Sequence, residues 1–346
     1  MPTKKTAISF KPKQVTKRLL AVLGERAQDV IISRYGLGVD TNRKTLEAIG
    51  EKYGITRERV RQIENHSLNL VRKSKEYEKD SEAFAEVHDL IHSLGCLVAE
   101  EELLSHISTN KSVQNHVHFI LVIGDAFIKE KEDEHFKHRW CVDSEISIKI
   151  QDSLKKVYKS LSDDDLIAEP DIIKSFLSHL ADLSDELKNQ EMAYRWLGVS
   201  KKIAKNPLGE WGKSDSTNVN AKGMRDYAYL VIRKHGSPIH FREVANEIEK
   251  LFGKKAHVAT THNELIKDKR FVLVGRGLYA LSEWGYISGV VKDVIKKILE
   301  KSGPLTKEDI ISKVLKERYV KENTILVNLQ NSKIFKKTKD GKFAIA

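Results

Sequence analysis

Residues 45–64 read TLEAIGEKYGITRERVRQIE, and this stretch decides the fold of the N-terminal part of the chain. Apolar residues three or four positions apart, such as Leu46 and Ile49, fall on one side of a first helix. Gly54 can adopt the turn conformation that residues with a Cβ atom resist, and Thr56 is a good N-cap for a second helix. The stretch therefore predicts a helix, a tight turn and a second helix.

The second helix is predicted to have one packing face and one free face. At about 100° per residue, the packing face is formed by Val60, Ile63, Ser67, Leu70 and Val71. The free face carries Arg57, Glu58, Arg61, Gln62 and Asn65. Arginine can donate two hydrogen bonds to guanine, glutamine can make two with adenine, and glutamate can accept one from cytosine. This face therefore has the chemistry to read bases in a major groove; the alternative is an ordinary solvated charged face.

Three segments resemble region 4 of the sigma-70 family of bacterial sigma factors in order and spacing: RYGL at 34–37, TLEAIG at 45–50 and TRERVRQIE at 56–64. The resemblance covers residues 15–73 and implies a helix-turn-helix that reads the −35 promoter element and docks on the flap of the RNA polymerase β subunit. It implies that base edges are contacted by Arg57, Glu58 and Gln62. It implies phosphate or supporting contacts for Thr45, Arg59 and Arg61.

A second resemblance lies in residues 223–286. The segments RDYAYL at 225–230, PIHFREV at 238–244 and KRFVLVGRGLYAL at 269–281 resemble the HARE-type winged helix. That family includes the N-terminal domain of the RNA polymerase delta subunit. The resemblance implies a winged-helix fold and a role as an adaptor for DNA or protein.

The rest of the chain predicts a mainly α protein, a helix-turn-helix followed by tandem winged-helix domains with small β-hairpin wings. The turn around Gly236 and Pro238 is echoed around Gly303 and Pro304, each between amphipathic helices. We expect joints at 73–80 and 206–223. The predicted organisation is a tail at 1–14, the helix-turn-helix at 15–73, possible winged helices at 81–143 and 144–213, the HARE-type winged helix at 223–286, and a basic winged helix at 287–346.

The net charge of +11 and pI near 9.3 favour a polyanionic partner, although a solubilising surface is the alternative. Residues 286–346 hold fourteen Lys or Arg against seven Asp or Glu. We expect the C-terminal hairpin to contact phosphate through Lys336 and Lys337. The alternative is a solubilising end of the chain.

Several other functions are not indicated by the sequence. The two cysteines, Cys96 and Cys141, form no CxxC pair, and no completed metal site accompanies the histidines. The segment GRG at 275–277 precedes a strand-like run, whereas a dinucleotide-binding fingerprint must open a helix. No membrane-spanning or signal segment is evident. We expect a cytoplasmic, non-enzymatic protein with no cofactor, no metal and no membrane partner.

The expected function is transcription regulation by sequence-specific binding to double-stranded promoter DNA. Because residues 1–14 leave no room for the other sigma segments, we expect no initiation by this chain alone. One alternative is a delta-like accessory subunit of RNA polymerase, docked through apolar helices around Leu19, Leu20 and 30–32. Another is a DNA-targeting module of a defence or modification system.

Overall fold

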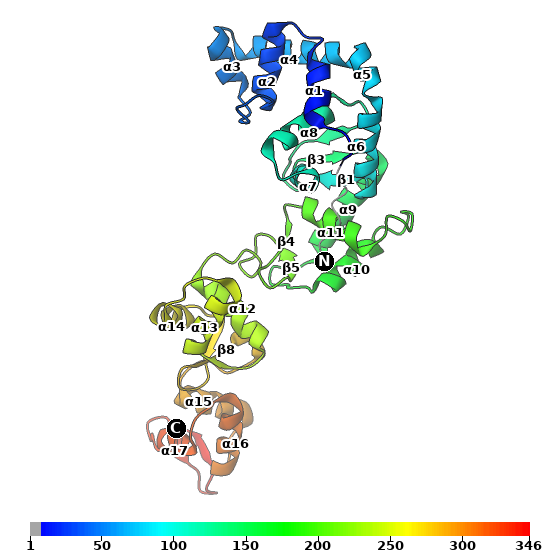
Figure 1. The fold of residues 1–346 in the computed structure, drawn as a ribbon. Helices are drawn as coiled ribbons and strands as arrows, with labels where there is room; N and C mark the ends of the chain where they lie inside the picture. The colour runs from blue at the N-terminus through cyan, green and yellow to red at the C-terminus, as the bar shows by residue number, and fades with distance from the viewer. Residues whose placement is uncertain (1–7) are drawn as a thin grey trace. The chain divides into compact units, whose positions relative to one another are not determined.

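The computed structural model describes residues 8–346 and is mainly helical, with short antiparallel strands (Figure 1). The predicted mainly α class is confirmed. The chain forms two compact units. Unit 1 extends to Ala204 and includes Trp211–Ser214, and unit 2 contains Lys205–Glu210 and Asp215–Ala346. Within residues 8–346, no helix combines the length and apolar character needed to cross a membrane.

Unit 1 begins with four helices and a short fifth one: α1 (Pro12–Leu20), α2 (Glu25–Tyr35), α3 (Leu46–Tyr53), α4 (Arg57–Arg72) and α5 (Lys75–Lys79). Helix α1 begins inside the segment predicted as a tail, with proline at its first position, where the missing N–H costs no hydrogen bond. Ile8 and Phe10 already pack against the core. The first seven residues of that predicted tail lie outside the described residues.

One element order then recurs: helix, strand, helix, helix, strand, strand. Repeat 1 contains α6 (Ser81–Ser93), β1 (Leu97–Ala99), α7 (Glu100–Ile107), α8 (Lys111–Ile123), β2 (Ile128–Glu130) and β3 (Arg139–Cys141). Repeat 3 contains α12 (Met224–His235), β6 (Ile239–His240), α13 (Phe241–Phe252), α14 (Val258–Lys267), β7 (Phe271–Leu273) and β8 (Leu278–Leu281), followed by the 3₁₀ helix η1 (Ser282–Trp284). In both sheets the last strand lies in the middle, as β1-β3-β2 and β6-β8-β7.

In the other two repeats the first strand shrinks to a single bridge. Repeat 2 contains α9 (Ser144–Ser160), α10 (Glu169–Ser178), α11 (Gln190–Val199), β4 (Ile203–Lys205) and β5 (Trp211–Lys213), and Ile167 bridges to Trp211. Repeat 4 contains α15 (Val291–Ser302), α16 (Lys307–Glu317), α17 (Glu322–Leu329), β9 (Phe335–Lys337) and β10 (Phe343–Ile345), and Leu305 bridges to Phe343. In all four repeats, the segment after the first helix therefore pairs with the last strand of the repeat.

The hydrophobic cores of unit 1 cross the borders of these modules. One core joins α1, α2 and the end of α4 to repeat 1, with Leu19, Ile31 and Val71 packed among Ile91, Phe119 and others. A second core joins β1 of repeat 1 to the helices of repeat 2. The N-terminal helices are therefore held by the next module as well as by one another.

Candidate nucleic-acid interface

The turn between α3 and α4 is built as its sequence predicts. Thr45 caps α3 by accepting a hydrogen bond from the Ala48 N–H at 3.1 Å, and Thr56 caps α4 by accepting one from the Arg59 N–H at 3.2 Å. Gly54 has a φ of 63°, a left-handed conformation that glycine adopts without the clash of a Cβ atom. The Ile55 N–H then donates to the Gly50 carbonyl at 2.9 Å, which closes the turn.

Gly50 is a further requirement of this turn. A Cβ atom on Gly50 would lie 2.6 Å from the backbone carbonyl oxygen of Ile55, closer than real contacts allow. The backbone of the turn therefore passes directly over the helix at a place where only glycine leaves room. In the sequence, Gly50 is visible only as the last residue of the TLEAIG segment.

Replacing Gly50 with alanine is expected to destabilise unit 1, although alanine is the better helix former by about 1 kcal/mol. The steric overlap must be relieved by moving the Ile55 backbone, and this displaces α4. The matched control is Gly198→Ala in α11, where the nearest atom to the new Cβ is 3.9 Å away. Thermal unfolding should show a lower Tm for the first variant and an unchanged or higher Tm for the second. Equal shifts would contradict the steric argument.

A small core fixes α4 against α2 and α3. Its buried residues are Val30, Ile49 and Val60, with partly buried Leu46, Tyr53, Ile55 and Ile63 around them. The predicted packing face of α4 is confirmed at Val60, Ser67 and Val71, which are at most 1% exposed. Leu70 was wrongly assigned to it: its side chain is 45% exposed, and Leu68 is buried instead.

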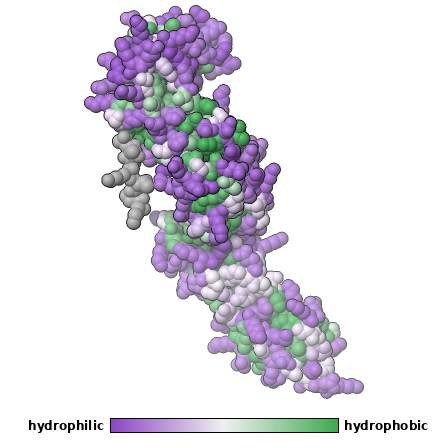
Figure 2. Space-filling view, turned by 90° about the vertical axis from the view of Figure 1, so that its right-hand side faces the viewer, coloured by the Kyte–Doolittle hydropathy of each residue, from purple (hydrophilic) through white to green (hydrophobic). Residues whose placement is uncertain are grey.

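The opposite side of α4 is free. Its exposed side chains are those of Arg57, Glu58, Arg59, Arg61, Gln62 and Asn65. This set contains the three residues expected to contact bases and two of those expected to support them. In Figure 2 the surface over α2 to α4 is mostly hydrophilic on the face in view.

The charged groups on this face form pairs. Arg61 donates to both carboxylate oxygens of Glu58, at 2.9 and 2.6 Å. This pairing lowers the pKa of Glu58 and raises that of Arg61. Arg57 donates to Glu47 at 3.0 Å, so the face is held in an ordered and partly neutralised arrangement.

Gln62 is paired in the same way. Its amide oxygen accepts a hydrogen bond from Arg59 at 3.0 Å. Exposed pairs of this kind contribute little to stability, so their members can exchange partners with DNA at small cost.

A buried polar contact, which the sequence pattern did not indicate, anchors the packing side of α4. Glu64 is only 9% exposed, accepts a hydrogen bond from the Tyr35 hydroxyl at 2.9 Å, and lies 3.4 Å from Arg34. Burial, together with the Glu64 carboxylate, raises the pKa of Tyr35. The sequence feature that could have indicated this contact is the position of Glu64, three residues before Ser67 on the packing side of α4. Tyr35 and Glu64 thus set the position of α4 without facing solvent.

Repeat 1 covers the outer side of α1 and α2. The Asn115 side chain on α8 donates to the carbonyls of Gly36 and Thr41, at 3.0 and 2.8 Å, and accepts from Arg43 at 3.1 Å. Arg72 at the end of α4 donates to the Ile123 carbonyl at 3.0 Å. These contacts fix the helix-turn-helix on repeat 1.

The apolar residues proposed above for polymerase docking are not available at the surface. Leu19, Leu20, Val30 and Ile31 are at most 4% exposed, and Ile32 is half-buried. All but Val30 belong to, or pack against, the core shared with repeat 1. The chain itself covers the side of α1 and α2 that would otherwise face a partner.

The remaining sequence-predicted residues lie elsewhere. Lys336 and Lys337 are exposed on β9 in unit 2, whereas α4 belongs to unit 1. Residues 275–277 form the turn between β7 and β8, as expected for a hairpin rather than a nucleotide-binding loop. Within the described chain, no three His, Cys, Asp or Glu side chains are grouped so that they could hold a metal ion.

Comparison with known proteins concerns the same N-terminal helices. Residues 19–73 match the family model "Sigma-70, region 4". The chain is 47% identical over 62 residues to RNA polymerase sigma factor RpoS of Coxiella burnetii, a match that covers 18% of this chain and 17% of the relative. It is 48% identical over 54 residues to RNA polymerase sigma factor SigA1 of Synechococcus elongatus, covering 16% and 13%.

A third relative matches the chain over a segment of comparable length. RNA polymerase principal sigma factor HrdD of Streptomyces viridifaciens is 42% identical over 55 residues, covering 16% of each chain. The chain thus spans less than a fifth of the length of each of these sigma factors. Residues 19–73 are a Sigma-70 region 4 domain.

Proposed function

We propose that this protein is a bacterial transcription regulator that binds double-stranded promoter DNA and reads a −35-like element through α4. The observation that carries the proposal is the exposed row of Arg57, Glu58 and Gln62 on a helix fixed by the Thr56 cap, a small core and the Glu64 anchor. A bidentate arginine donor, an amide that both donates and accepts, and a carboxylate on one helix face match the hydrogen-bonding patterns of base pairs in the major groove. The region 4 domain supports the same assignment.

Arg59 and Arg61 are proposed to position the helix on the phosphates. Both are exposed and lie within five residues of the base-reading side chains. When α4 enters the groove, Arg59 would exchange Gln62, and Arg61 would exchange Glu58, for phosphate oxygens. Phosphate contacts fix register and orientation but carry no sequence information. Thr45, which caps α3, has a hydroxyl hydrogen left to donate to a phosphate.

The repeats after the helix-turn-helix are proposed to be winged-helix modules. Their element order and sheet order support this, with β2–β3, β7–β8 and β9–β10 as the wings. For residues 223–286 we retain the HARE-type assignment as a proposal. The element order of repeat 3 and its hairpin, which turns at Gly275–Gly277, support this proposal.

A contact with RNA polymerase is part of the proposal, because the relatives of the region 4 domain are RNA polymerase sigma factors by name. Docking on the β-subunit flap through the apolar side of α1 and α2 is the less supported route. Those side chains form the core with repeat 1, and exposing them would require the core to open. The accessory-subunit alternative therefore loses the feature that favoured it.

The test is the affinity of the intact protein for a duplex carrying a −35-like element and for a scrambled duplex of equal length. Fluorescence anisotropy across a series of salt concentrations gives both the preference and the number of phosphate contacts. We expect the element to be bound about 10³-fold more tightly, the lower end for specific binders. Equal affinity for both duplexes at every salt concentration would reject base reading by α4.

A further inference from the structure

Positive charge is distributed very unevenly along the chain. Residues 223–346, which contain repeats 3 and 4, hold 25 Lys or Arg against 14 Asp or Glu, an excess equal to the net charge of the whole chain. Residues 81–213, which contain repeats 1 and 2, hold 16 against 24. A polyanion is therefore attracted to the last two repeats and repelled by the first two.

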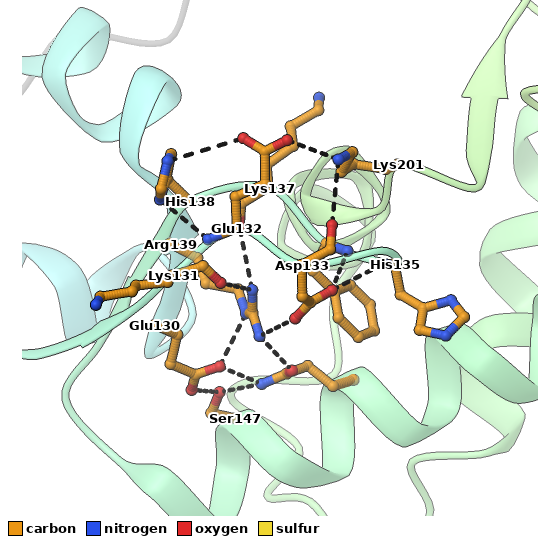
Figure 3. Close-up of polar contacts among 12 residues, drawn as sticks. Glu130, Lys131, Glu132, Asp133, His135, Lys137, His138, Arg139, Ser147 and Lys201 are labelled. Atoms are coloured by element: carbon orange, nitrogen blue, oxygen red, sulfur yellow. Dashed lines mark hydrogen bonds and ion pairs between the residues drawn. The ribbon is translucent and has the colours of Figure 1, made fainter.

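At least eight of the 16 Lys and Arg residues of repeats 1 and 2 lie within ion-pair distance of a carboxylate. Figure 3 shows the most buried example, Arg139, which is 4% exposed and lies 2.8 Å from Glu130 and 3.1 Å from Asp133. Nearby, the Lys201 ammonium donates to Glu132 at 2.6 Å. These charges support the fold and are not available to a phosphate.

The hairpin of repeat 1, formed by β2 and β3, is also engaged in contacts within unit 1. Its connecting segment, residues 131–138, is fastened to repeat 2 by backbone hydrogen bonds. The Lys201 N–H donates to the His135 carbonyl at 2.7 Å, and the Lys137 N–H donates to the Val199 carbonyl at 3.0 Å. A wing held in this way cannot also contact a DNA backbone through the same groups.

The third helices of repeats 1 and 2 are used for packing. In α8, eight of the nine residues from Asn115 to Ile123 are buried, and the helix lies against α1 and α2. In α11, the Trp196 indole N–H donates to the Gly95 carbonyl of repeat 1 at 3.0 Å, and Arg195 donates to Glu102 at 2.8 Å. Helix α8 presents no free face to a groove, and the exposed side chains of α11, those of Gln190, Glu191 and Tyr194, include no cation.

The third helices of repeats 3 and 4 are different. In α14 only Thr261 and Leu265 are buried, and in α17 only Ile325 and Leu329. Exposed cations flank both helices along the chain: Lys254, Lys255, Lys267, Lys269 and Arg276 in repeat 3, and Lys333, Lys336, Lys337, Lys339 and Lys342 in repeat 4. Among residues 8–346, none of these ten cations lies within ion-pair distance of a carboxylate.

From these three differences, in net charge, in ion pairing and in burial of the third helix, we infer that unit 2 is a second DNA-binding site. It binds duplex phosphates through the unpaired cations around α14 and α17, independently of sequence, while repeats 1 and 2 make no contact with DNA. The site is separate from α4 and does not depend on base reading by Arg57, Glu58 and Gln62. It supplies affinity, whereas α4 supplies preference.

The experiment compares two fourfold variants of the intact protein on the scrambled duplex across a salt series. The unit 2 variant is Lys255→Gln, Lys269→Gln, Lys336→Gln and Lys337→Gln. The matched control is Lys149→Gln, Lys156→Gln, Lys159→Gln and Lys174→Gln, which removes the same charge from exposed positions of repeat 2. Each phosphate contact contributes about 0.9 to the slope of log Kobs against log salt concentration.

We expect the unit 2 variant to bind about 10-fold or more weakly at roughly 0.15 M salt, with a slope reduced by about 2 to 4, and the control to change by less than about 2-fold. Lysine to arginine substitutions at the same four positions in unit 2 should restore binding, which separates loss of charge from loss of fold. Equal small effects of both glutamine variants would overturn the inference and leave an acidic protein as the partner of this surface. The preference for a −35-like element should persist in the unit 2 variant, so failure here is distinguishable from failure of base reading by α4.

Discussion

The double variant Arg57→Ala and Gln62→Ala is expected to lose the preference for a −35-like element while still binding DNA. Each bidentate contact to a base contributes about 1–3 kcal/mol of discrimination, so the pair accounts for about 2–6 kcal/mol. That corresponds to a loss of at least about 30-fold in the ratio of affinities for element and scrambled duplex, up to the whole of the expected preference of about 10³-fold. The salt dependence should stay close to that of the wild type, because neither side chain is assigned to a phosphate.

The control for this variant is Lys156→Ala and Gln190→Ala, which removes one cation and one amide from exposed positions of repeat 2. Its preference should equal that of the wild type. Both variants should unfold within about 0.5 kcal/mol of the wild type, because all four side chains are on the surface. A wild-type preference that survives loss of Arg57 and Gln62 would assign base reading to another surface.

Leu19→Ala is expected to destabilise the helix-turn-helix and repeat 1 together. Leu19 is fully buried in the core that they share, and removal of a buried leucine side chain costs about 2–5 kcal/mol because of the cavity that remains. Leu70→Ala removes the same atoms from a side chain that is 45% exposed, and it should cost no more than about 0.5 kcal/mol.

Hydrogen exchange detected by mass spectrometry measures this coupling. Leu19→Ala should lower the protection of α8 by the same free energy as that of α1, since both helices line one core. Peptides from α14 in unit 2 should exchange as in the wild type, because they lie outside that core. If α8 kept its full protection while α1 lost it, the two modules would be separate folding units.

The coupling has a functional consequence. Sequence preference depends on the angle at which α4 is presented, and α4 is tied to repeat 1 through Arg72 and through the core around Val71. Asn115 fixes the other side by holding the carbonyls of Gly36 and Thr41. Under the proposed function, repeat 1 supports α4 as the base-reading helix, and its own third helix is used for that packing.

Local features were predictable from the sequence. The turn at Gly54, the caps at Thr45 and Thr56, and the polar face that includes Arg57 depend on interactions within a few residues. The hairpin at 271–281 is equally local, since its strands are short and adjacent in the chain. Spacing and side-chain chemistry are sufficient where the partners of a residue are its neighbours in sequence.

Long-range partners were not predictable. An apolar stripe such as the one containing Leu19 and Ile31 indicates that another surface covers it, but not which surface. Another protein was expected to cover this stripe. In the structure α8 of the same chain covers it. The exposure of Leu70 and the burial of Glu64 were not predictable for the same reason. The helical period shows which residues share a face, but not how far the neighbouring helices extend over that face.

The sequence by itself therefore determined that a region 4-type helix-turn-helix is present, and which side of its second helix is polar. Only the tertiary structure decided which modules are free to bind. The third helices of repeats 1 and 2 pack against segments far apart in the chain, while α14 and α17 have only two buried residues each. Burial of one helix by another depends on the whole fold, and no local pattern of residues records it.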